Sequence, residues 1–331
     1  MRAADPTRAL RAGAADKNRS ARDTDIPSPK CRESYSGGSK TGDLLDALMA
    51  VDSLTATQKR NVTLNHADFQ QQRKLSARFV RDLSESINRS FQAWIEARQA
   101  NDYRLFEKPL ERIIELKQQQ AEMLGYTDHP YNALMDEFDK GATVAATDLL
   151  FSDLQADLQP ILKRLLEKPA VNEECLRQHF PKQHQWEYGL YLLKEIQFDF
   201  DAGRQDISEH PFTVNFNAQD VRLTTRIDEN DFGNMTWSCL HEGGHGLYEQ
   251  GLPNSEYGLP LGEYCSLSIH ESQSRFWENQ VGRSRGFWQQ QYPALQSRFP
   301  KQFGSVSLQE FYAAINAVKP SLIRTEADEL T

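Results

Sequence analysis

Apolar side chains recur at steps of three and four residues along most of the chain from about Asp43 onward. This is the period of an amphipathic helix, which buries one face and exposes the other. The clearest stripe, within 69–102, consists of Phe79, Leu83, Ile87, Phe91 and Trp94. The same spacing predicts further helices over 103–124, 144–167, 172–197 and 307–318. The chain is therefore expected to be mainly α.

Alternation typical of β-strands is confined to one short region. FTVNFN (212–217) and VRLTTRI (221–227) alternate apolar and polar residues, and AQD lies between them as a turn. This pattern predicts a β-hairpin just before a histidine-rich segment. We expect a small β-sheet beside the helix that carries those histidines.

Residues 1–40 differ from the rest of the chain. They are rich in Arg, Ala, Ser and Gly, contain few large apolar residues and end in SYSGGSK. A segment with so little apolar surface cannot offset the entropy that it loses on ordering. We predict a disordered or foreign N-terminal segment over 1–40 and a helical domain over 41–331.

Composition narrows the class of protein. The chain has 331 residues, of which 39% are hydrophobic and 26% charged, with a net charge of −9 and a pI near 5.5. This acidic balance argues against a nucleic-acid partner, which needs a basic face. No apolar run approaches the roughly 20 residues that cross a bilayer, so no membrane association is expected. Four scattered cysteines without a CxxC pair favour reduced thiols and a cytoplasmic location.

The candidate chemistry lies in HEGGHGLYEQG, residues 241–251. Residues i and i+4 project from one face of an α-helix, so His241 and His245 can offer two imidazoles to one metal ion. Glu242 can reach a water on that ion and act as general base, which is the HExxH arrangement of zinc peptidases. The alternative is a glycine-rich helix whose histidines serve only packing.

The glycines of this segment favour the metal-site interpretation. Gly243, Gly244 and Gly246 each cost a helix interior up to about 1 kcal/mol relative to alanine. The close approach of a neighbouring backbone or of substrate would explain them. Gly251 is placed to end the helix.

A third protein ligand has to come from another segment, and two glutamates are candidates. Glu263 lies 18 residues after His245, and Glu271 lies 26 residues after it. Both fall in a segment that reads as one helix from near Leu261 to Gly282. We favour Glu271, because its spacing resembles that of thimet-oligopeptidase-like peptidases and it lies in the polar cluster HESQ (270–273). Glu263 keeps a possible supporting role beside the ligands.

Five motifs occur in a characteristic order: HPF at 210–212, DxRxT at 220–224, HExxH at 241–245, HESQ at 270–273 and IRxxAD at 323–328. HPYNALMDEFDKGAT (129–143) precedes them. Over roughly residues 60–331 the chain thus resembles the Taq-type thermostable metallocarboxypeptidases. The resemblance implies a helical zincin-type peptidase fold with a small β-sheet beside the HExxH helix. It also implies one divalent metal, removal of C-terminal amino acids from peptides, and a homodimer in the full-length form.

The resemblance assigns the metal to His241, His245 and Glu271. It assigns the general base to Glu242. Zinc is the expected metal, although a set of two histidines and one glutamate also accepts Co²⁺ or Mn²⁺.

The remaining motifs supply candidates for substrate binding. Arg324 is the candidate for the substrate's terminal carboxylate, since a guanidinium forks onto a carboxylate. Arg222 is the runner-up, and His210 is a further candidate substrate contact. Structural alternatives stay open, namely a salt bridge within the sheet for Arg222 and a strand entry for His210. The candidates for residues that support the ligands or Arg324 are Asp220, His270, Asp328 and Glu263.

The chain departs from this family at both ends. Family members are longer, and they carry a GxxQDxHW motif beyond IRxxAD, whereas this sequence stops at Thr331. The early family segment has no counterpart in 1–60. We therefore expect a catalytic domain that is truncated at both ends and lacks one wall of its cleft. Three functions are weighed: a zinc carboxypeptidase, an oligoendopeptidase with the same ligand spacing, and a truncated, inactive metal-binding homologue.

Overall fold

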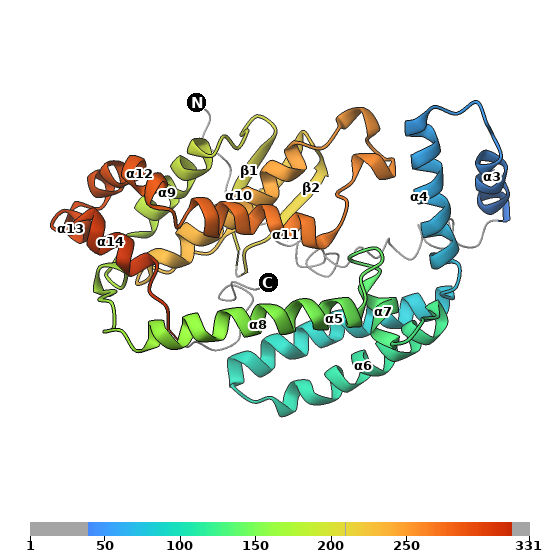
Figure 1. Ribbon diagram of the computed structural model, residues 1–331, viewed down its shortest axis with the longest axis horizontal. Coiled ribbons are helices and arrows are strands. Elements are labelled where there is room, and N and C mark those ends of the chain that lie inside the picture. Colours follow the sequence, from blue (N-terminus) through green and yellow to red (C-terminus); the bar gives the residue numbers. More distant parts are fainter. Residues whose placement is uncertain (1–38, 209, 320–331) are drawn as a thin grey trace. The chain divides into compact units, whose positions relative to one another are not determined.

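The computed structural model describes residues 39–208 and 210–319, drawn in colour in Figure 1. The chain divides into two compact units, Met1–Val144 and Ala145–Thr331, and each is described by itself. Most of the predicted disordered segment, and the candidates Arg324 and Asp328, lie outside the described residues. Among the described helices, none is both long enough and apolar enough to span a bilayer.

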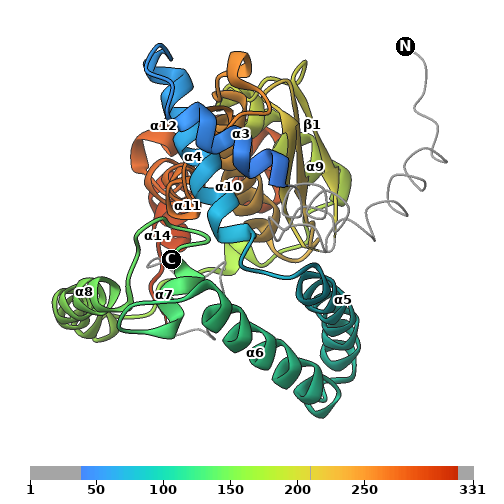
Figure 2. The ribbon, with the colours of Figure 1, turned by 90° about the vertical axis from the view of Figure 1, so that its right-hand side faces the viewer.

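The N-terminal unit is helical. Its helices are α3 (Ser39–Met49), α4 (Ala56–Gln72), α5 (Ala77–Ala100), α6 (Arg104–Leu124) and α7 (Pro130–Met135). Helices α5 and α6 pack against each other (Figure 2). The first half of the predicted apolar stripe, Phe79 and Leu83, forms a small core with Leu116. The second half, Phe91 and Trp94, is exposed, so the stripe is only partly buried.

The C-terminal unit contains longer helices and the sheet. Its helices are α8 (Val144–Leu166), α9 (Lys182–Glu195), α10 (Phe232–Gln250), α11 (Leu267–Arg275), α12 (Arg285–Arg298), α13 (Pro300–Phe303) and α14 (Leu308–Ile315). Its strands are β1 (Gly203–Ile207), β2 (Thr213–Asn217) and β3 (Asp220–Thr225). Short 3₁₀ turns occupy Glu174–Leu176, Asn254–Glu256 and Pro260–Gly262, and a π-helix occupies Phe276–Val281. The predicted mainly α fold with a small β-sheet is confirmed.

The sheet contains the predicted hairpin and one additional strand. Strands β2 and β3 pair antiparallel with Thr213 opposite Leu223, as the alternating pattern predicts. Strand β1 pairs parallel with β3, giving the order β1-β3-β2. The sequence of β1, GRQDI, is mostly polar and carries little strand signal. Strand β2 is therefore an edge strand on the side away from β1.

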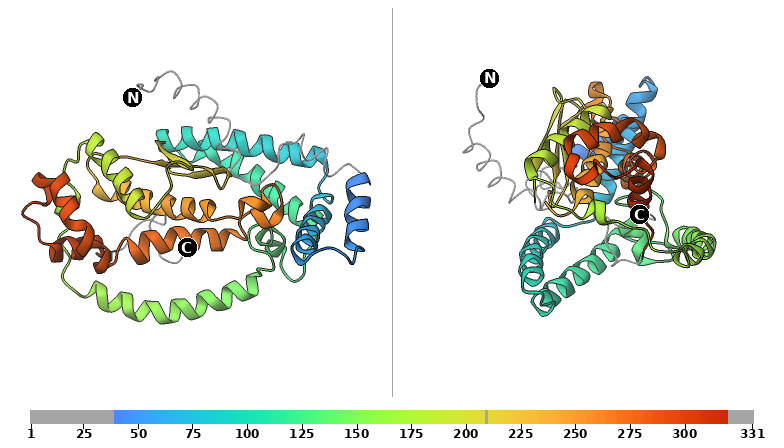
Figure 3. Two further views of the ribbon diagram at one scale, coloured as in Figure 1. Left: turned by 90° about the horizontal axis from the view of Figure 1, so that it is seen from above. Right: turned by 90° about the vertical axis from the view of Figure 1, so that its left-hand side faces the viewer.

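Helix α10 is the central element of this unit. It contacts β2 and β3 on one side and α11 on the other, so sheet, α10 and α11 form successive layers (Figure 3). Its N-terminal end lies in an aromatic core, where Phe232 contacts the rings of Phe180, Phe299, Phe303 and Phe311. Further along, Leu240 joins a second cluster with Val221 and Leu223 of β3. Burial on both sides fixes the rotation of α10 and therefore the direction of its histidines.

Two helix starts differ from the sequence prediction. Helix α9 begins at Lys182, ten residues later than expected, because Pro181 precedes it and the stretch 174–176 forms a 3₁₀ turn. Helix α11 begins at Leu267 instead of Leu261. The side chain of Ser266 caps it by accepting a hydrogen bond from the backbone N–H of Ile269. The predicted end at Gly282 is confirmed, because the π-helix carries the chain that far.

Candidate metal centre

The histidine-bearing helix has well-defined ends. The side chain of Asp231 accepts a hydrogen bond from the backbone N–H of Gly233 and so caps the start of α10. Gly251 follows the last residue of the helix, as predicted. The two caps and the buried flanks hold the HExxH turn inside a rigid helix.

The glycines of this turn allow other elements to approach closely. A Cβ at Gly244 would lie 2.5 Å from the backbone oxygen of Gln273 and 2.6 Å from Cα of Ser274. The predicted approach of a neighbouring backbone is therefore present at Gly244, and the backbone belongs to α11. At Gly243 and Gly246 the neighbours are instead side chains, from Leu193 and Ile196 and from Phe198 and Leu223, respectively.

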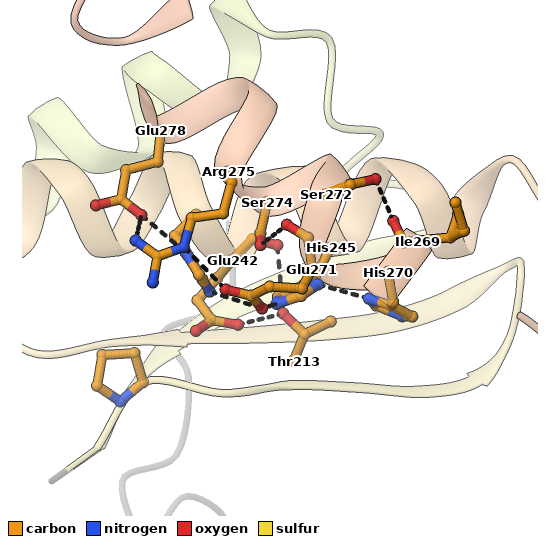
Figure 4. Close-up of polar contacts among 12 residues, drawn as sticks. Thr213, Glu242, His245, Ile269, His270, Glu271, Ser272, Ser274, Arg275 and Glu278 are labelled. Atoms are coloured by element: carbon orange, nitrogen blue, oxygen red, sulfur yellow. Dashed lines mark hydrogen bonds and ion pairs between the residues drawn. The ribbon is translucent and has the colours of Figure 1, made fainter. Parts of the chain in front are cut away.

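Three candidate ligands converge where α11 crosses α10. His241 Nε2 lies 3.8 Å from Glu271 Oε2, and His245 Nε2 lies 3.4 Å from the same oxygen. One ligand atom from each residue falls within 4.8 Å of the others. Ligand atoms at about 2.0–2.2 Å from a tetrahedral ion lie about 3.3–3.6 Å apart, so this donor set fits a divalent cation such as zinc. Figure 4 shows His245 and Glu271 side by side at this point.

Glu242 lies beside this cluster and is held by the edge strand. Its side chain is buried, and Thr213 Oγ1 donates a hydrogen bond to Oε2 at 2.5 Å (Figure 4). Thr213 was not expected from the sequence, because no local spacing connects β2 with α10. The contact follows from the packing of β2 on α10.

The charges of the site favour a cation at its centre. Burial opposes ionisation of Glu271, but the neighbouring imidazoles of His245 and His241 and the guanidinium of Arg275 lower its pKa to about 2. Burial likewise opposes a charge on His241, but its hydrogen bond to Glu278 and the nearby carboxylates raise its pKa. The carboxylates thus attract positive charge, which a divalent ion supplies in place of protons.

Comparison with known proteins identifies the family. The family model described as Carboxypeptidase Taq (M32) metallopeptidase matches residues 15–331. The chain belongs to the M32 metallocarboxypeptidase family. It is 39% identical over 293 residues to Carboxypeptidase 1 of Bacillus subtilis, which covers 87% of this chain and 58% of the relative. It is 39% identical over 275 residues to Thermostable carboxypeptidase 1 of Thermus thermophilus, covering 80% of this chain and 53% of that protein.

Comparison with a solved structure supports the same family. The M32 carboxypeptidase of Deinococcus radiodurans superposes with a TM-score of 0.86 at 37% identity, covering 96% of this chain and 64% of that one. The M32 chain therefore spans little more than half the length of the curated relatives that it matches. Membership of a metallopeptidase family implies a divalent metal, and the cluster of His241, His245 and Glu271 could hold it.

Further polar residues surround the candidate ligands of this M32 chain. Glu278 Oε2 accepts a hydrogen bond from His241 Nδ1 at 2.9 Å. Arg275 donates from Nε to Glu271 Oε1 at 3.0 Å and from Nη1 to Glu278 Oε2 at 3.3 Å. Arg275 lies four positions and Glu278 seven positions after Glu271, on the same helix face. That spacing is a signal by which the sequence could have revealed both residues.

The other predicted site residues occupy different places. Arg222 donates from Nε and Nη2 to both oxygens of Asp220 at 2.8 Å, which is the ion pair that the sequence left open as an alternative. His210 is exposed directly before β2, and its Nδ1 lies 2.7 Å from the carbonyl oxygen of Pro211. Glu263 is exposed in the loop before α11, where it lines a pocket together with Asn215 and Tyr257, outside the ligand cluster. The supporting role of Glu263 stays a prediction.

Proposed function

We propose that this chain carries the catalytic centre of a metal-dependent carboxypeptidase, which removes C-terminal amino acids from peptides. The observation that carries the proposal is the convergence of His241, His245 and Glu271 on one point in an M32 chain. The names of the relatives, Carboxypeptidase 1 and Thermostable carboxypeptidase 1, support the reaction class. The chain spans little more than half of the length of these relatives, so the activity of the relatives is proposed, and not assigned, for this protein.

The proposed chemistry divides between the metal and the protein. A divalent metal supplies Lewis acidity, which activates water and polarises the peptide carbonyl. Glu242 takes the proton of the attacking water and passes it to the leaving amine. Thr213 donates to Oε2 of Glu242, which fixes the carboxylate and leaves Oε1 for the proton.

Recognition of a free C-terminus requires a fixed cation beyond the metal. One edge of the Arg222 guanidinium, Nε with Nη2, is bonded to Asp220, so this edge would have to leave that pair to bind a substrate carboxylate. This arrangement favours Arg324 for the role, as the motif order suggests. Zinc as the metal, a homodimeric full-length form and a cytoplasmic location stay predictions.

The decisive experiment compares a peptide with its C-terminally amidated twin, using the purified chain loaded with zinc. A carboxypeptidase cleaves the free peptide and spares the amide, and a chelator abolishes the reaction. Cleavage of both would indicate an oligoendopeptidase. One bound zinc per chain without turnover would indicate an inactive metal-binding homologue.

A variant separates binding from catalysis. Glu242→Gln should retain zinc, as measured by mass spectrometry, and lose hydrolysis, because the amide cannot accept the proton. Retained turnover in this variant would refute Glu242 as the general base.

A further inference from the structure

The side of His245 that faces away from Glu271 is occupied by a chain of hydrogen bonds. His245 Nδ1 lies 2.5 Å from Nδ1 of His270, and His270 Nε2 lies 2.6 Å from Glu249 Oε1. The other oxygen of Glu249 accepts a hydrogen bond from Nδ2 of Asn215 on β2. The chain thus runs from the candidate metal ligand through α11 and back to α10, and it ends on the edge strand (Figure 4 shows the first link).

The positions of the hydrogens in this series of hydrogen bonds follow from the donor at its Asn215 end. Asn215 presents an amide N–H, so Glu249 accepts on that side, and an ionised carboxylate accepts on both sides. His270 must then carry its hydrogen on Nε2, facing Glu249. A neutral imidazole has only one N–H, so Nδ1 of His270 becomes an acceptor. It can only accept from Nδ1–H of His245.

The consequence concerns the metal. With its hydrogen on Nδ1, His245 has a lone pair on Nε2, which is the atom that faces Glu271. The opposite hydrogen placement would put N–H where the metal has to bind. We propose that Glu249, acting through His270, holds His245 in the tautomer that binds metal, so that Glu249 and His270 are positioning residues. This inference rests on the proposed metal site.

The residues around these hydrogen bonds stabilise this arrangement. The side chains of His270 and Glu249 are 13% and 5% exposed, so bulk water competes little for their hydrogen bonds. The rings of Tyr248 and Tyr264 contact His270 edge-on, each with a centroid distance of 5.1 Å. These contacts fix the plane of the imidazole and hence the direction of both nitrogens.

The structure also predicts which substitution reverses the direction of these hydrogen bonds. In Glu249→Gln, the N–H of Asn215 attracts the amide oxygen, so the amide nitrogen faces Nε2 of His270. The hydrogen of His270 then moves to Nδ1 and opposes the N–H of His245. We expect the zinc dissociation constant to rise by about 10–100-fold, which is the usual effect of removing a partner of a ligating histidine.

Reversing the last link should restore the site. In the double variant Asn215→Asp with Glu249→Gln, residue 215 accepts a hydrogen bond, so the amide turns its nitrogen toward β2 and its oxygen toward His270. The net charge of the pair is also retained. Zinc affinity should return close to that of the unmodified chain, whereas a role in packing alone predicts no recovery.

The experiment measures zinc affinity by competition with a chromophoric chelator on the whole 331-residue chain. Glu195→Gln is the matched control, because Glu195 also accepts a hydrogen bond from a neighbouring helix, from Gln291, but contacts no histidine. It should bind zinc like the unmodified chain. Unchanged affinity in Glu249→Gln, or a double variant no better than Glu249→Gln, would overturn the proposal.

A spectroscopic measurement decides the question without any variant. Long-range ¹⁵N correlation spectra of the histidine rings, recorded with and without zinc at a pH where both rings are neutral, report which nitrogen carries hydrogen. We expect hydrogen on Nε2 of His270 and on Nδ1 of His245, and the reverse pattern would overturn the proposal. If the unmodified chain bound no zinc, the proposed function would fail, yet the spectra of the metal-free chain would still test the tautomers.

Discussion

The substitution Gly244→Ala tests how closely the two ligand-bearing helices must be held. The new Cβ would lie 2.5 Å from the backbone oxygen of Gln273, whereas ordinary van der Waals contact begins at 3.4 Å. Backbone atoms cannot rotate away, so α10 and α11 have to separate by roughly 1 Å to admit the methyl group. His241 and His245 lie on one of these helices and Glu271 on the other, so the separation acts directly on the ligand distances.

Two opposing effects set the change in stability. Overpacking a tight contact costs about 1–3 kcal/mol, and replacing a helical glycine by alanine returns about 1 kcal/mol. We expect the free energy of unfolding of the metal-free chain to fall by at most about 2 kcal/mol, and Tm to fall by at most roughly 8 °C. A shift of roughly 1 Å exceeds the tolerance of about 0.2 Å for ligand distances, so the zinc dissociation constant should rise at least about tenfold.

Gly243→Ala is the matched control for this prediction. Its Cβ would meet Ile196 Cδ1 at 2.6 Å and Leu193 Cδ2 at 2.8 Å, which are the ends of flexible side chains. Those ends can rotate without moving α11, so stability should change while zinc affinity stays close to that of the unmodified chain. Thermal unfolding followed by circular dichroism and zinc competition measure the two quantities. If both variants bind zinc equally well, the backbone contact at Gly244 does not set the ligand spacing.

Three further predictions follow from individual contacts. Thr213→Val removes the hydrogen bond to Glu242 Oε2, and a hydrogen bond to a charged group contributes about 1.5–3 kcal/mol. We therefore expect kcat/KM to fall by about 10–150-fold with zinc content unchanged. The pKa of Glu271 in the folded chain is lowered to about 2, so its stabilising contribution is present above the ordinary value of 4.5 and is lost as the pH falls toward 2. Glu271→Gln lacks this contribution. Acid titrations of the metal-free chain should therefore show a shallower loss of stability in the variant than in the unmodified chain. If Arg324 binds the terminal carboxylate, Arg324→Met should raise KM for a peptide with a free C-terminus by about 10–100-fold, and by more than Arg222→Met does. Equal effects of the two variants on KM in steady-state kinetics would contradict that assignment.

The sequence predicted the long helices well because their pattern is local. Helices α6 and α8 have apolar residues with helical period along their own length, and their ends fall close to the predicted ones. Helix α5 carries the predicted stripe but begins only at Ala77, because α4 occupies the start of the stretch 69–102. The early start predicted for α11 shows the limit of this reasoning. Residues 261–266 continue a plausible helical spacing, but a 3₁₀ turn at Pro260–Gly262 and the cap at Ser266 delay the helix. Strand β1 was missed because its stability depends on pairing with β3, not on its own mostly polar residues.

The candidate site shows the same division between local and tertiary information. The i, i+4 spacing of His241 and His245 is a property of one helix, so the sequence alone places both on one face. The spacing could place Glu278 on the face of Glu271, but its contact with His241, like that of His270 with His245, depends on how α11 crosses α10. No spacing along the chain encodes that crossing. Gly244 is its only trace in the HExxH turn itself, as the residue at which the two backbones touch.

The described parts of the proposed machinery fall within one stretch of the C-terminal unit, from Thr213 on β2 to Glu278 after α11. Within this stretch, α10 packs on the sheet through the same turns that carry the candidate ligands. Metal binding should therefore depend on this stretch, whereas the proposed recognition of a free C-terminus would also use Arg324, which lies beyond it. The two properties are separable by mutation: changes at Gly244 or Glu249 should weaken metal binding, and changes at Arg324 should weaken substrate binding without loss of metal.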